Sequence, residues 1–369
     1  MHAPRVHTRD GSLDGLLMPD LPMLMQENVA LAPLTTMGVG GPARYFVEAT
    51  TTREVHEATE YADSHKLPLF VLGGGSNLIV SDRGWPGLVL KVAIRGINHR
   101  HGHGTVYFDA GAGEDWDEFV AATVAHKCAG IECLSGIPGS VGGTPVQNVG
   151  AYGQEVAETI DSLVAFDLKT GEEQEFEKGD CGFSYRRSIF NTSERARYVI
   201  LRVTFALKHG WDARIAYADL QKYFANWKHT PTLPEVRRAV REIRASKSML
   251  ITPGDEDARS AGSFFKNPVV SPQEFVELKQ RASAKGLEIP SYPALDAQHK
   301  VSAAWLVEHS GFSKGYGKGR AGISRKHALA IVNRGGATAS EILALKDEIQ
   351  ERVQKTWGIR LQPEPVLVG

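Results

Sequence analysis

The hydrophobic and polar positions of this chain follow two periods that change along its length. Residues 45–49 ("YFVEA") and 105–111 ("TVYFDAG") alternate with the period of two that is typical of strands. Residues 52–65 and 114–128 carry apolar side chains at the spacing of amphipathic helices. Short apolar runs at 67–73, 78–81, 87–92 and 198–207 predict further strands, and Thr170-Gly171 predicts a hairpin within 163–176.

From about residue 212 the pattern becomes rich in helices. Val236, Val240 and Ile243 mark one face of a helix over 233–247, and Ser271 with Glu274 forms a capping-box sequence at the start of another. A last striped helix precedes a terminal strand over 359–369. We therefore predict an α+β fold with a flexible extension at 1–25. A first domain at 26–214 is joined by the terminal strand, 357–369, and a second domain covers 215–356.

Composition excludes several classes of protein. The 369 residues are 42% hydrophobic and 23% charged, with a formal net charge of −1, so the chain offers no basic surface for a nucleic acid. The three cysteines form no CxxC pair, which favours a reducing compartment and the cytoplasm. No apolar run reaches the ~18 residues of a transmembrane helix, and the "MPDLP" segment interrupts any signal-peptide core.

Two glycine-rich runs are candidates for phosphate binding. The first, "GGGSN" at residues 73–77, directly follows a predicted buried strand, where backbone N–H groups can approach phosphate oxygens. The second, "SGIPGSVGGTPVQNVGAYG" at residues 135–153, has apolar anchors and a length that indicates a functional loop. A tight turn is the alternative for the first run. Together the two loops could hold the two phosphates of one dinucleotide.

Isolated polar residues in apolar surroundings are the next candidates for substrate binding or catalysis. Arg186 and Arg187 in "SYRRSIF" are flanked by aromatic residues, so one guanidinium is a candidate carboxylate ligand, although paired arginines are more often surface charges. Glu364 stands between two prolines, and its alternative is an edge-strand glutamate facing water. His99, His101 and His103 alternate, but no acidic ligand is close in the chain, and we predict no metal site.

Five motifs in one order carry a family resemblance. "VLGGGSNLIVSD", "SGIPGSVGGTPVQNVGAYGQEV", "FSYRRSIF", "AGSFFKNPVV" and "LQPEPVLVG" run from about residue 30 to the C-terminus. The chain resembles the UDP-N-acetylenolpyruvoylglucosamine reductase (MurB) family, in the subtype with a substrate-clamping tyrosine. The resemblance implies a FAD-binding fold of the vanillyl-alcohol-oxidase (PCMH) type, non-covalent FAD, and a C-terminal α+β substrate domain.

The resemblance also implies a reaction and its residues. NADPH reduces FAD, and reduced FAD passes hydride to the enolpyruvyl methylene carbon of a nucleotide sugar, giving UDP-N-acetylmuramate for peptidoglycan. Arg186 is then the carboxylate-binding arginine, Ser263 the acid that protonates C2, and Glu364 the glutamate that stabilises the intermediate. We expect Phe265 beside Ser263 and Phe264 on the opposite strand face.

The remaining site residues follow from the same motifs. Tyr185, Tyr217, Lys247 and Asn267 match substrate-binding positions, whereas Val366 stands where the family can carry an arginine. No site is assigned to the glycine- and lysine-rich 314–325 segment. The expected FAD-binding residues are Gly73, Gly74, Gly75, Ser76, Asn77, Ile137, Pro138, Gly139, Ser140, Gly142, Gly143, Gly150, Ala151, Tyr152 and Gly153.

Two alternatives belong to other functional classes. One is a FAD-dependent oxidase of the same fold, and the other is a non-catalytic sensor of nucleotide sugars. The oxidase alternative predicts a His or Cys tether for flavin, which "GGGSN" lacks. The joint presence of Arg186, Ser263 and Glu364 argues against the sensor. We expect a monomer with a small-molecule substrate and without membrane or nucleic-acid partners.

Overall fold

The computed structural model describes residues 24–317 and 319–369, which form two compact units. The first comprises the described residues up to Val29, together with Ala43–Gly74 and Pro86–Ile243. The second comprises Ala30–Pro42, Gly75–Trp85 and Arg244–Gly369. All but the last two residues of the predicted extension, 1–25, lie outside the described part. The predicted domains, 26–214 and 215–356, remain predictions.

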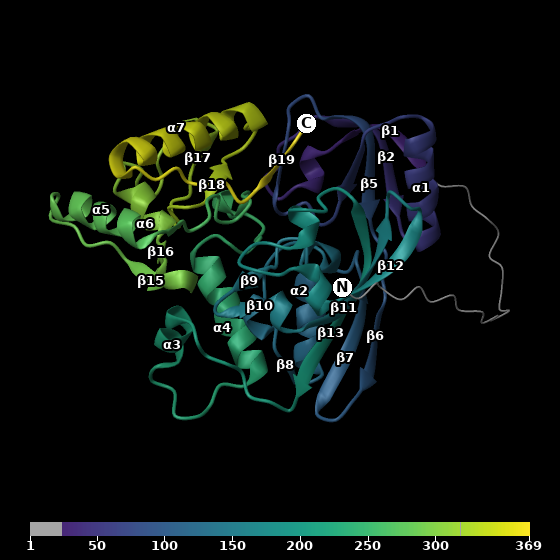
Figure 1. Ribbon diagram of the computed structural model, residues 1–369, viewed down its shortest axis with the longest axis horizontal. Coiled ribbons are helices and arrows are strands. Elements are labelled where there is room, and N and C mark those ends of the chain that lie inside the picture. The colour runs from purple at the N-terminus through teal and green to yellow at the C-terminus, as the bar shows by residue number, and fades with distance from the viewer. Residues whose placement is uncertain (1–23, 318) are drawn as a thin grey trace. The chain divides into compact units, whose positions relative to one another are not determined.

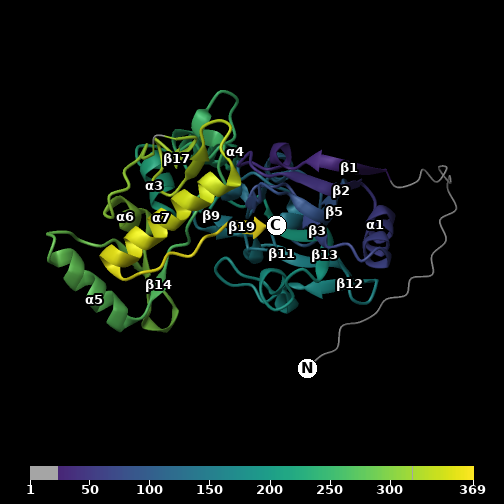
Figure 2. The ribbon, with the colours of Figure 1, turned by 90° about the horizontal axis from the view of Figure 1, so that it is seen from above.

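The first unit begins with a four-stranded sheet of order β1-β2-β5-β3, in which β3 and β5 are parallel. Helix α1 packs its buried face, which includes Val55 and Ala58, into the same cluster as residues of β2 and β5 (Figure 2). A complete capping box between Thr51 and Glu54 starts this helix. The bounds are β1 Met25–Ala30, β2 Pro42–Ala49, α1 Thr52–Ser64, β3 Leu69–Leu72 and β5 Trp85–Val92.

A second, six-stranded sheet of the first unit has the order β12-β11-β13-β7-β6, with β8 also paired to β13. Its strands pair in antiparallel fashion, and the predicted hairpin around Thr170-Gly171 joins β11 and β12 (Figure 1). The bounds are β6 Ile97–His101, β7 Thr105–Gly111, β8 Cys128–Ala129, β11 Ile160–Asp167, β12 Glu172–Glu177 and β13 Tyr198–His209. Short strands β9 Gly150–Ala151 and β10 Gln154–Glu155 form a separate hairpin.

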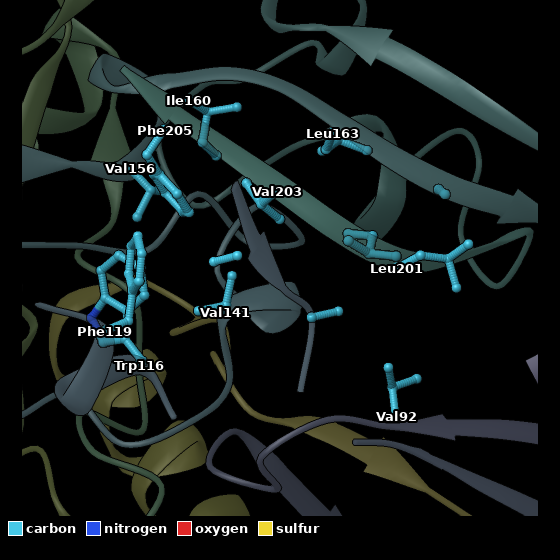
Figure 3. Packing of buried hydrophobic residues seen from close by; sticks show 14 of the residues in the cluster. Val92, Trp116, Phe119, Val141, Val156, Ile160, Leu163, Leu201, Val203 and Phe205 are labelled. Atoms are coloured by element: carbon cyan, nitrogen blue, oxygen red, sulfur yellow. The ribbon is translucent and has the colours of Figure 1, made fainter. Parts of the chain in front are cut away.

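Aromatic rings of α2 and β13 form the centre of the first unit's core. Trp116, Phe119 and Phe205 are fully buried, with ring centroids 5.0–5.8 Å apart (Figure 3). Helix α2 spans Trp116–Ala125, shorter at both ends than the predicted 114–128, and Asp115 caps its first turn. Helices α3 (Ala218–Phe224) and α4 (Leu233–Ser246) bury Leu220, Val236 and other side chains in a smaller cluster.

The second unit contains a three-stranded sheet, β14-β16-β15, and two strand pairs, β17-β18 and β19-β4. Helix α7 packs against β17 and β18 (Figure 1), and its complete capping box joins Thr338 to Glu341. The strands are β4 Leu78–Val80, β14 Val269–Val270, β15 Ser291–Pro293, β16 His299–Val301, β17 Ala321–Ile323, β18 Ile331–Asn333 and β19 Val366–Val368. The helices are α5 Pro272–Ser283, α6 Ala303–Glu308 and α7 Ala339–Trp357.

The predicted terminal strand over 359–369 is wrong in extent. Only Val366–Val368 forms a strand, parallel to β4, and Glu364 precedes it. Pro363 and Pro365 explain this difference, because proline cannot donate a ladder hydrogen bond. Among the described helices, none has the length and apolarity needed to cross a membrane.

Candidate active site

The two predicted glycine-rich loops touch in the first unit. A Cβ built on Gly74 would lie 2.5 Å from the Cα of Gly139, and one built on Gly73 would lie 2.9 Å from Ser140 Oγ. Side chains cannot be accommodated at such distances, so glycine permits the contact between the loops. This juxtaposition is the one that phosphate binding by both loops requires.

Helix α2 and its N-terminal segment hold the second loop in place. Trp116 N–H donates to the carbonyl of Gly139 at 3.1 Å, and Gly142 N–H donates to the carbonyl of Ala112 at 2.9 Å. Asp117 accepts the N–H of Gly136 at 2.6 Å through Oδ1. Hydrogen bonds to α2 and to the segment before it therefore fix the backbone of the second glycine-rich loop.

Asp117 also joins this loop to α4. Arg237 donates to both carboxylate oxygens, and Arg241 donates to Oδ2. Burial acts to raise the pKa of Asp117, but the hydrogen bonds from Arg237 and Gly136 and the charges of both arginines outweigh it, so the pKa is lowered. The carboxylate thus remains charged at neutral pH and ties two helices to the loop.

The rest of the first glycine run belongs to the second unit. Gly75 has φ +65°, and its built Cβ would lie 1.9 Å from the carbonyl oxygen of Leu34, so only glycine fits there. Thr36 binds this segment twice, donating through its N–H to the carbonyl of Gly75 and through its hydroxyl to the carbonyl of Ser76. The 32–36 segment therefore shapes the loop, a role that sequence reasoning missed.

Residues 150–153 form a hairpin with a two-residue turn. Tyr152 and Gly153 have φ values of 49° and 84°, as a type I′ turn requires at both central positions. The Tyr217 ring lies 5.4 Å from the Tyr152 ring in an edge-on arrangement. Tyr217 is 45% exposed at the N-cap of α3.

Arg186 occupies a strained turn beside this hairpin. Ser184 and Arg187 exchange two backbone hydrogen bonds of 3.0 Å, and Arg186 between them has φ +56°, which is uncommon for a residue with a side chain. Its Nη2 donates to the carbonyl of Gly150 at 2.8 Å, so the half-buried guanidinium points towards the hairpin. Tyr185 is the other central residue of the turn, and Arg187 is exposed.

The second unit brings three distant motifs together at Glu364. Glu364 N–H donates to the carbonyl of Phe264 at 2.9 Å, and Lys266 N–H donates to the carbonyl of Gln362 at 2.9 Å. The two segments therefore pair, which places Ser263 and Glu364 on adjacent strands of chain. Asn77 Nδ2 donates to the carbonyl of Glu364 at 3.2 Å, and its own carbonyl accepts the N–H of Val366.

The expected alternation of Phe264 and Phe265 is wrong. Residues 262–264 form a bend, so the backbone has no regular two-residue period there. Both rings are buried in one cluster, with centroids 5.5 Å apart. The half-buried Ser263 thus precedes two anchored aromatics, which fix its backbone.

Two lysines and a histidine influence one another elsewhere in the second unit. Burial, followed by the charges of Lys247 and Lys314, lowers the pKa of His327 to about 4, so its imidazole is neutral at physiological pH. Its Nδ1 accepts the N–H of Leu329 at 3.1 Å, which leaves Nε2 to carry the proton. Sequence reasoning found Lys247 but missed Lys314 and His327, although the lysine-rich "SKGYGKGR" segment was a signal.

Asn267, a predicted substrate ligand, has a structural contact as well. Its Oδ1 accepts the N–H of Ala303 at 2.9 Å at the start of α6. This bond fixes the orientation of the Asn267 side chain at the start of α6. Within residues 24–317 and 319–369, no group of three or more His, Cys, Asp or Glu side chains could hold a metal ion.

Two segments of the chain match known protein families. Residues 43–177 match the family model of a FAD binding domain, and residues 253–368 match that of the UDP-N-acetylenolpyruvoylglucosamine reductase C-terminal domain. The predicted α+β class, with a FAD-binding fold of the vanillyl-alcohol-oxidase type and a C-terminal domain, is confirmed. The chain belongs to the UDP-N-acetylenolpyruvoylglucosamine reductase family.

Individual relatives agree with this assignment. The reductase of Streptomyces coelicolor is 44% identical over 94% of this chain and 91% of its own length. That of Thermobifida fusca is 45% identical over 93% of this chain and 97% of its own. The crystal structure of the Thermus caldophilus enzyme matches with a TM-score of 0.62 at 28% identity, covering 94% of this chain and all of the other.

Proposed function

We propose that this protein reduces UDP-N-acetylglucosamine enolpyruvate to UDP-N-acetylmuramate with NADPH as hydride donor and FAD as bound cofactor. One observation carries the proposal: residues 264–266, directly after Ser263, pair with residues 362–364, and the carbonyl of Glu364 accepts the side-chain amide of Asn77. The identity of 44–45% with reductases along most of the chain supports the same reaction.

The residues of the glycine-rich loops fit FAD. Gly73 and Gly74 lie against Gly139 and Ser140, so backbone and small hydroxyl donors of both loops are available to a pyrophosphate. Tyr152, in its tight hairpin turn, offers a rigid ring for the flavin or adenine. When bound, FAD supplies the hydride chemistry that no side chain can perform.

Three residues of the chain are proposed to act on the enolpyruvyl group. Hydride addition at C3 places negative charge at C2 and in the carboxylate. The Arg186 guanidinium binds this carboxylate bidentately, and Glu364 stabilises the same charge through a hydrogen bond. Ser263 donates its hydroxyl proton to C2, which is a far stronger base than the serine alkoxide formed. The half-buried Lys266 can ease the charge on that oxygen.

The nucleotide half of the substrate requires cationic and polar ligands. Lys247, Lys314 and the neutral His327 offer two positive charges and a donor, which suit a diphosphate. We propose that the Asn267 amide contributes a further donor. Tyr217 is proposed to fold over the substrate and Tyr185 to contact it.

The biological setting follows from the reaction. The product is a precursor of peptidoglycan, so we propose roles in cell-wall biogenesis, cell shape, and division within the cell cycle. We propose a cytoplasmic monomer, because the substrate is a soluble nucleotide sugar. Neither a nucleic acid nor a membrane is needed for this chemistry.

An anaerobic half-reaction experiment tests the proposed function. NADPH should bleach the flavin of the yellow protein, and the enolpyruvyl nucleotide should then restore the colour without oxygen. Recovery of colour with oxygen alone would indicate an oxidase instead. A protein that binds the nucleotide but is not bleached by NADPH would be the sensor.

A further inference from the structure

The guanidinium of Arg334 is enclosed by backbone carbonyls of the second unit. Nη2 donates to the carbonyls of Gly315, Tyr316 and Ile323 at 2.9, 3.0 and 3.1 Å, and Nη1 donates to that of Gly317. Four carbonyl dipoles that converge on one point repel each other unless a cation lies between them. A single side chain therefore fixes the 315–317 backbone, in the segment to which the sequence assigns no site.

A glycine makes room for this guanidinium. Gly322 lies in β17, opposite Val332 in β18. A Cβ built on Gly322 would lie 2.3 Å from Cζ of Arg334 and 2.4 Å from Nη2. Because the carbonyls hold the guanidinium, it cannot easily move aside. Gly322 in β17 thus makes room for the guanidinium of Arg334, which directly follows β18.

The loop whose backbone is held by Arg334 carries Lys314. Gly315 N–H donates to the carbonyl of Ser324 and Ile323 N–H donates to that of Tyr316, so the loop lies along β17. Tyr316 Oη donates to Glu348 of α7 at 2.7 Å, which anchors the far side of the loop. The position of the Lys314 ammonium relative to His327 therefore depends on the backbone that Arg334 fixes.

We propose that Arg334 is a positioning residue for nucleotide binding: its guanidinium, admitted by Gly322, holds the 315–317 backbone so that Lys314 reaches the diphosphate of the substrate. The inference rests on the proposed function, because it assigns the diphosphate to Lys247, Lys314 and His327. Both terminal nitrogens of Arg334 donate to carbonyls, so the proposed role acts through the loop backbone and not through a contact with the substrate.

A planar guanidinium is needed for this arrangement. Lysine keeps the positive charge but offers three donors around one nitrogen, which cannot span four carbonyls from two segments. Arg334→Lys should therefore retain only part of the function. Arg334→Ala should be partly rescued by added guanidinium ion, which can enter the vacated carbonyl cage.

The experiment compares Arg334→Ala, Arg334→Lys and Gly322→Ala with the parental holoenzyme. Arg320→Gln is the matched control, because Arg320 is an exposed arginine of the same segment with one carbonyl contact, to Gly336 at 3.1 Å. UDP binding is measured by calorimetry, the KM for the enolpyruvyl nucleotide by turnover, and flavin reduction by NADPH in stopped flow. Thermal unfolding reports whether each variant is folded.

We expect UDP affinity to fall and KM to rise by roughly tenfold or more in Arg334→Ala and Gly322→Ala, with flavin reduction unchanged. The KM and UDP affinity of Arg334→Lys should lie between those of these variants and of the parent. Added guanidinium should lower the KM in Arg334→Ala and in no other variant. The Gly322→Ala variant keeps the arginine, so it tests the inference even if Arg334→Ala does not fold.

Two results separate the inference from the function on which it rests. If the parent turns over substrate while both Arg334→Ala and Gly322→Ala keep its KM and UDP affinity, the inference is overturned and the reductase function stands. A uniform loss of flavin reduction, substrate reduction and stability, without guanidinium rescue, also overturns it, since Arg334 would then be a general fold determinant. A parent that binds no UDP overturns both.

Discussion

Single residues show both what sequence reasoning can reach and where it stops. The family resemblance implies Ser263 as a candidate acid, but the sequence does not give its surroundings, because 262–264 is a bend instead of a strand. Both phenylalanines are buried in one cluster, which local alternation cannot predict. Arg186 was predicted as a functional guanidinium, whereas its positive φ depends on hydrogen bonds within the Ser184–Arg187 turn.

Replacement of Ser263 tests its proposed role as proton donor. Ser263→Ala should leave flavin reduction by NADPH nearly unchanged, because that half-reaction needs no proton at C2. Product formation in the second half-reaction should fall by about 10²–10⁴-fold, the contribution typical of a positioned acid. Anaerobic stopped-flow absorbance follows the two halves separately.

The cysteine variant serves as the control for Ser263. A thiol can still donate a proton, so Ser263→Cys should retain more activity than Ser263→Ala. Deuterium from labelled reduced flavin should appear at C3 of recovered substrate if protonation is the step that stalls. Parental product formation by Ser263→Ala would show that the serine is only structural.

At the scale of elements, most strands and helices are predictable because their hydrophobic periods are strong. The 52–65 helix, the 163–176 hairpin and the Ser271 capping box all occur close to the predicted positions. Contacts between loops are not predictable in this way, since they depend on backbone approaches between remote glycines. The contact of Gly74 with Gly139 is the clearest example.

Gly74→Ala tests whether this contact is needed for FAD. The added Cβ must push the two glycine loops apart, so FAD affinity should fall by at least about tenfold, and the free energy of unfolding should drop by about 1–3 kcal/mol. Fluorescence titration of the apoprotein with FAD gives the affinity. Gly179→Ala is the control, because no atom lies within 4 Å of a Cβ built there. Equal FAD affinity in both variants would contradict the proposed role.

Asp117 makes the link between α2, α4 and the second glycine loop dependent on pH. Its folded-state pKa is lowered, so its contribution to stability is present above the unfolded carboxyl pKa of about 4 and is lost as pH falls through the folded value. Asp117→Asn should reduce the free energy of unfolding by about 1–3 kcal/mol at neutral pH. The difference from the parent should shrink below about pH 4.

Urea unfolding at several pH values measures this dependence. The exposed Asp212→Asn is the matched control and should leave the free energy of unfolding at its parental value throughout. If the free energy of unfolding of Asp117→Asn stays below the parental value by the same amount at acidic pH, the shape of the Asp117 side chain, and not its charge, holds the loop.

At the scale of the whole molecule, the proposed site residues are divided between two compact units, and this division is the property least predictable from the sequence. Arg186 and the second glycine loop belong to the first unit, whereas Ser263 and Glu364 belong to the second. The first glycine run is itself divided after Gly74. Residues 30–42 and 75–85 join the second unit through pairing with distant segments, such as β4 with β19, which a linear reading of domains does not reveal.

The buried state of all three cysteines leads to a prediction about how the molecule holds flavin. A cysteine tether requires a thiolate, yet burial raises the pKa of Cys128, and burial followed by the nearby Asp180 charge raises that of Cys181 to about 12. Cys133 shares a buried cluster with Tyr152 of the second glycine loop, and burial and then the Glu132 charge raise its pKa most strongly. The two glycine runs, 73–77 and 135–153, contain neither cysteine nor histidine.

Flavin should therefore be held without a covalent bond. Acid precipitation of the yellow protein should leave FAD in the supernatant, and absorbance of that supernatant measures it. Mixing the refolded apoprotein with FAD should restore the flavin and raise the unfolding temperature, because FAD binds only the folded chain. The variant Cys133→Ser should release flavin in the same way as the parent. Colour retained in the acid pellet of the parent, but not of Cys133→Ser, would identify a covalent bond at the one thiol that lies near the second loop.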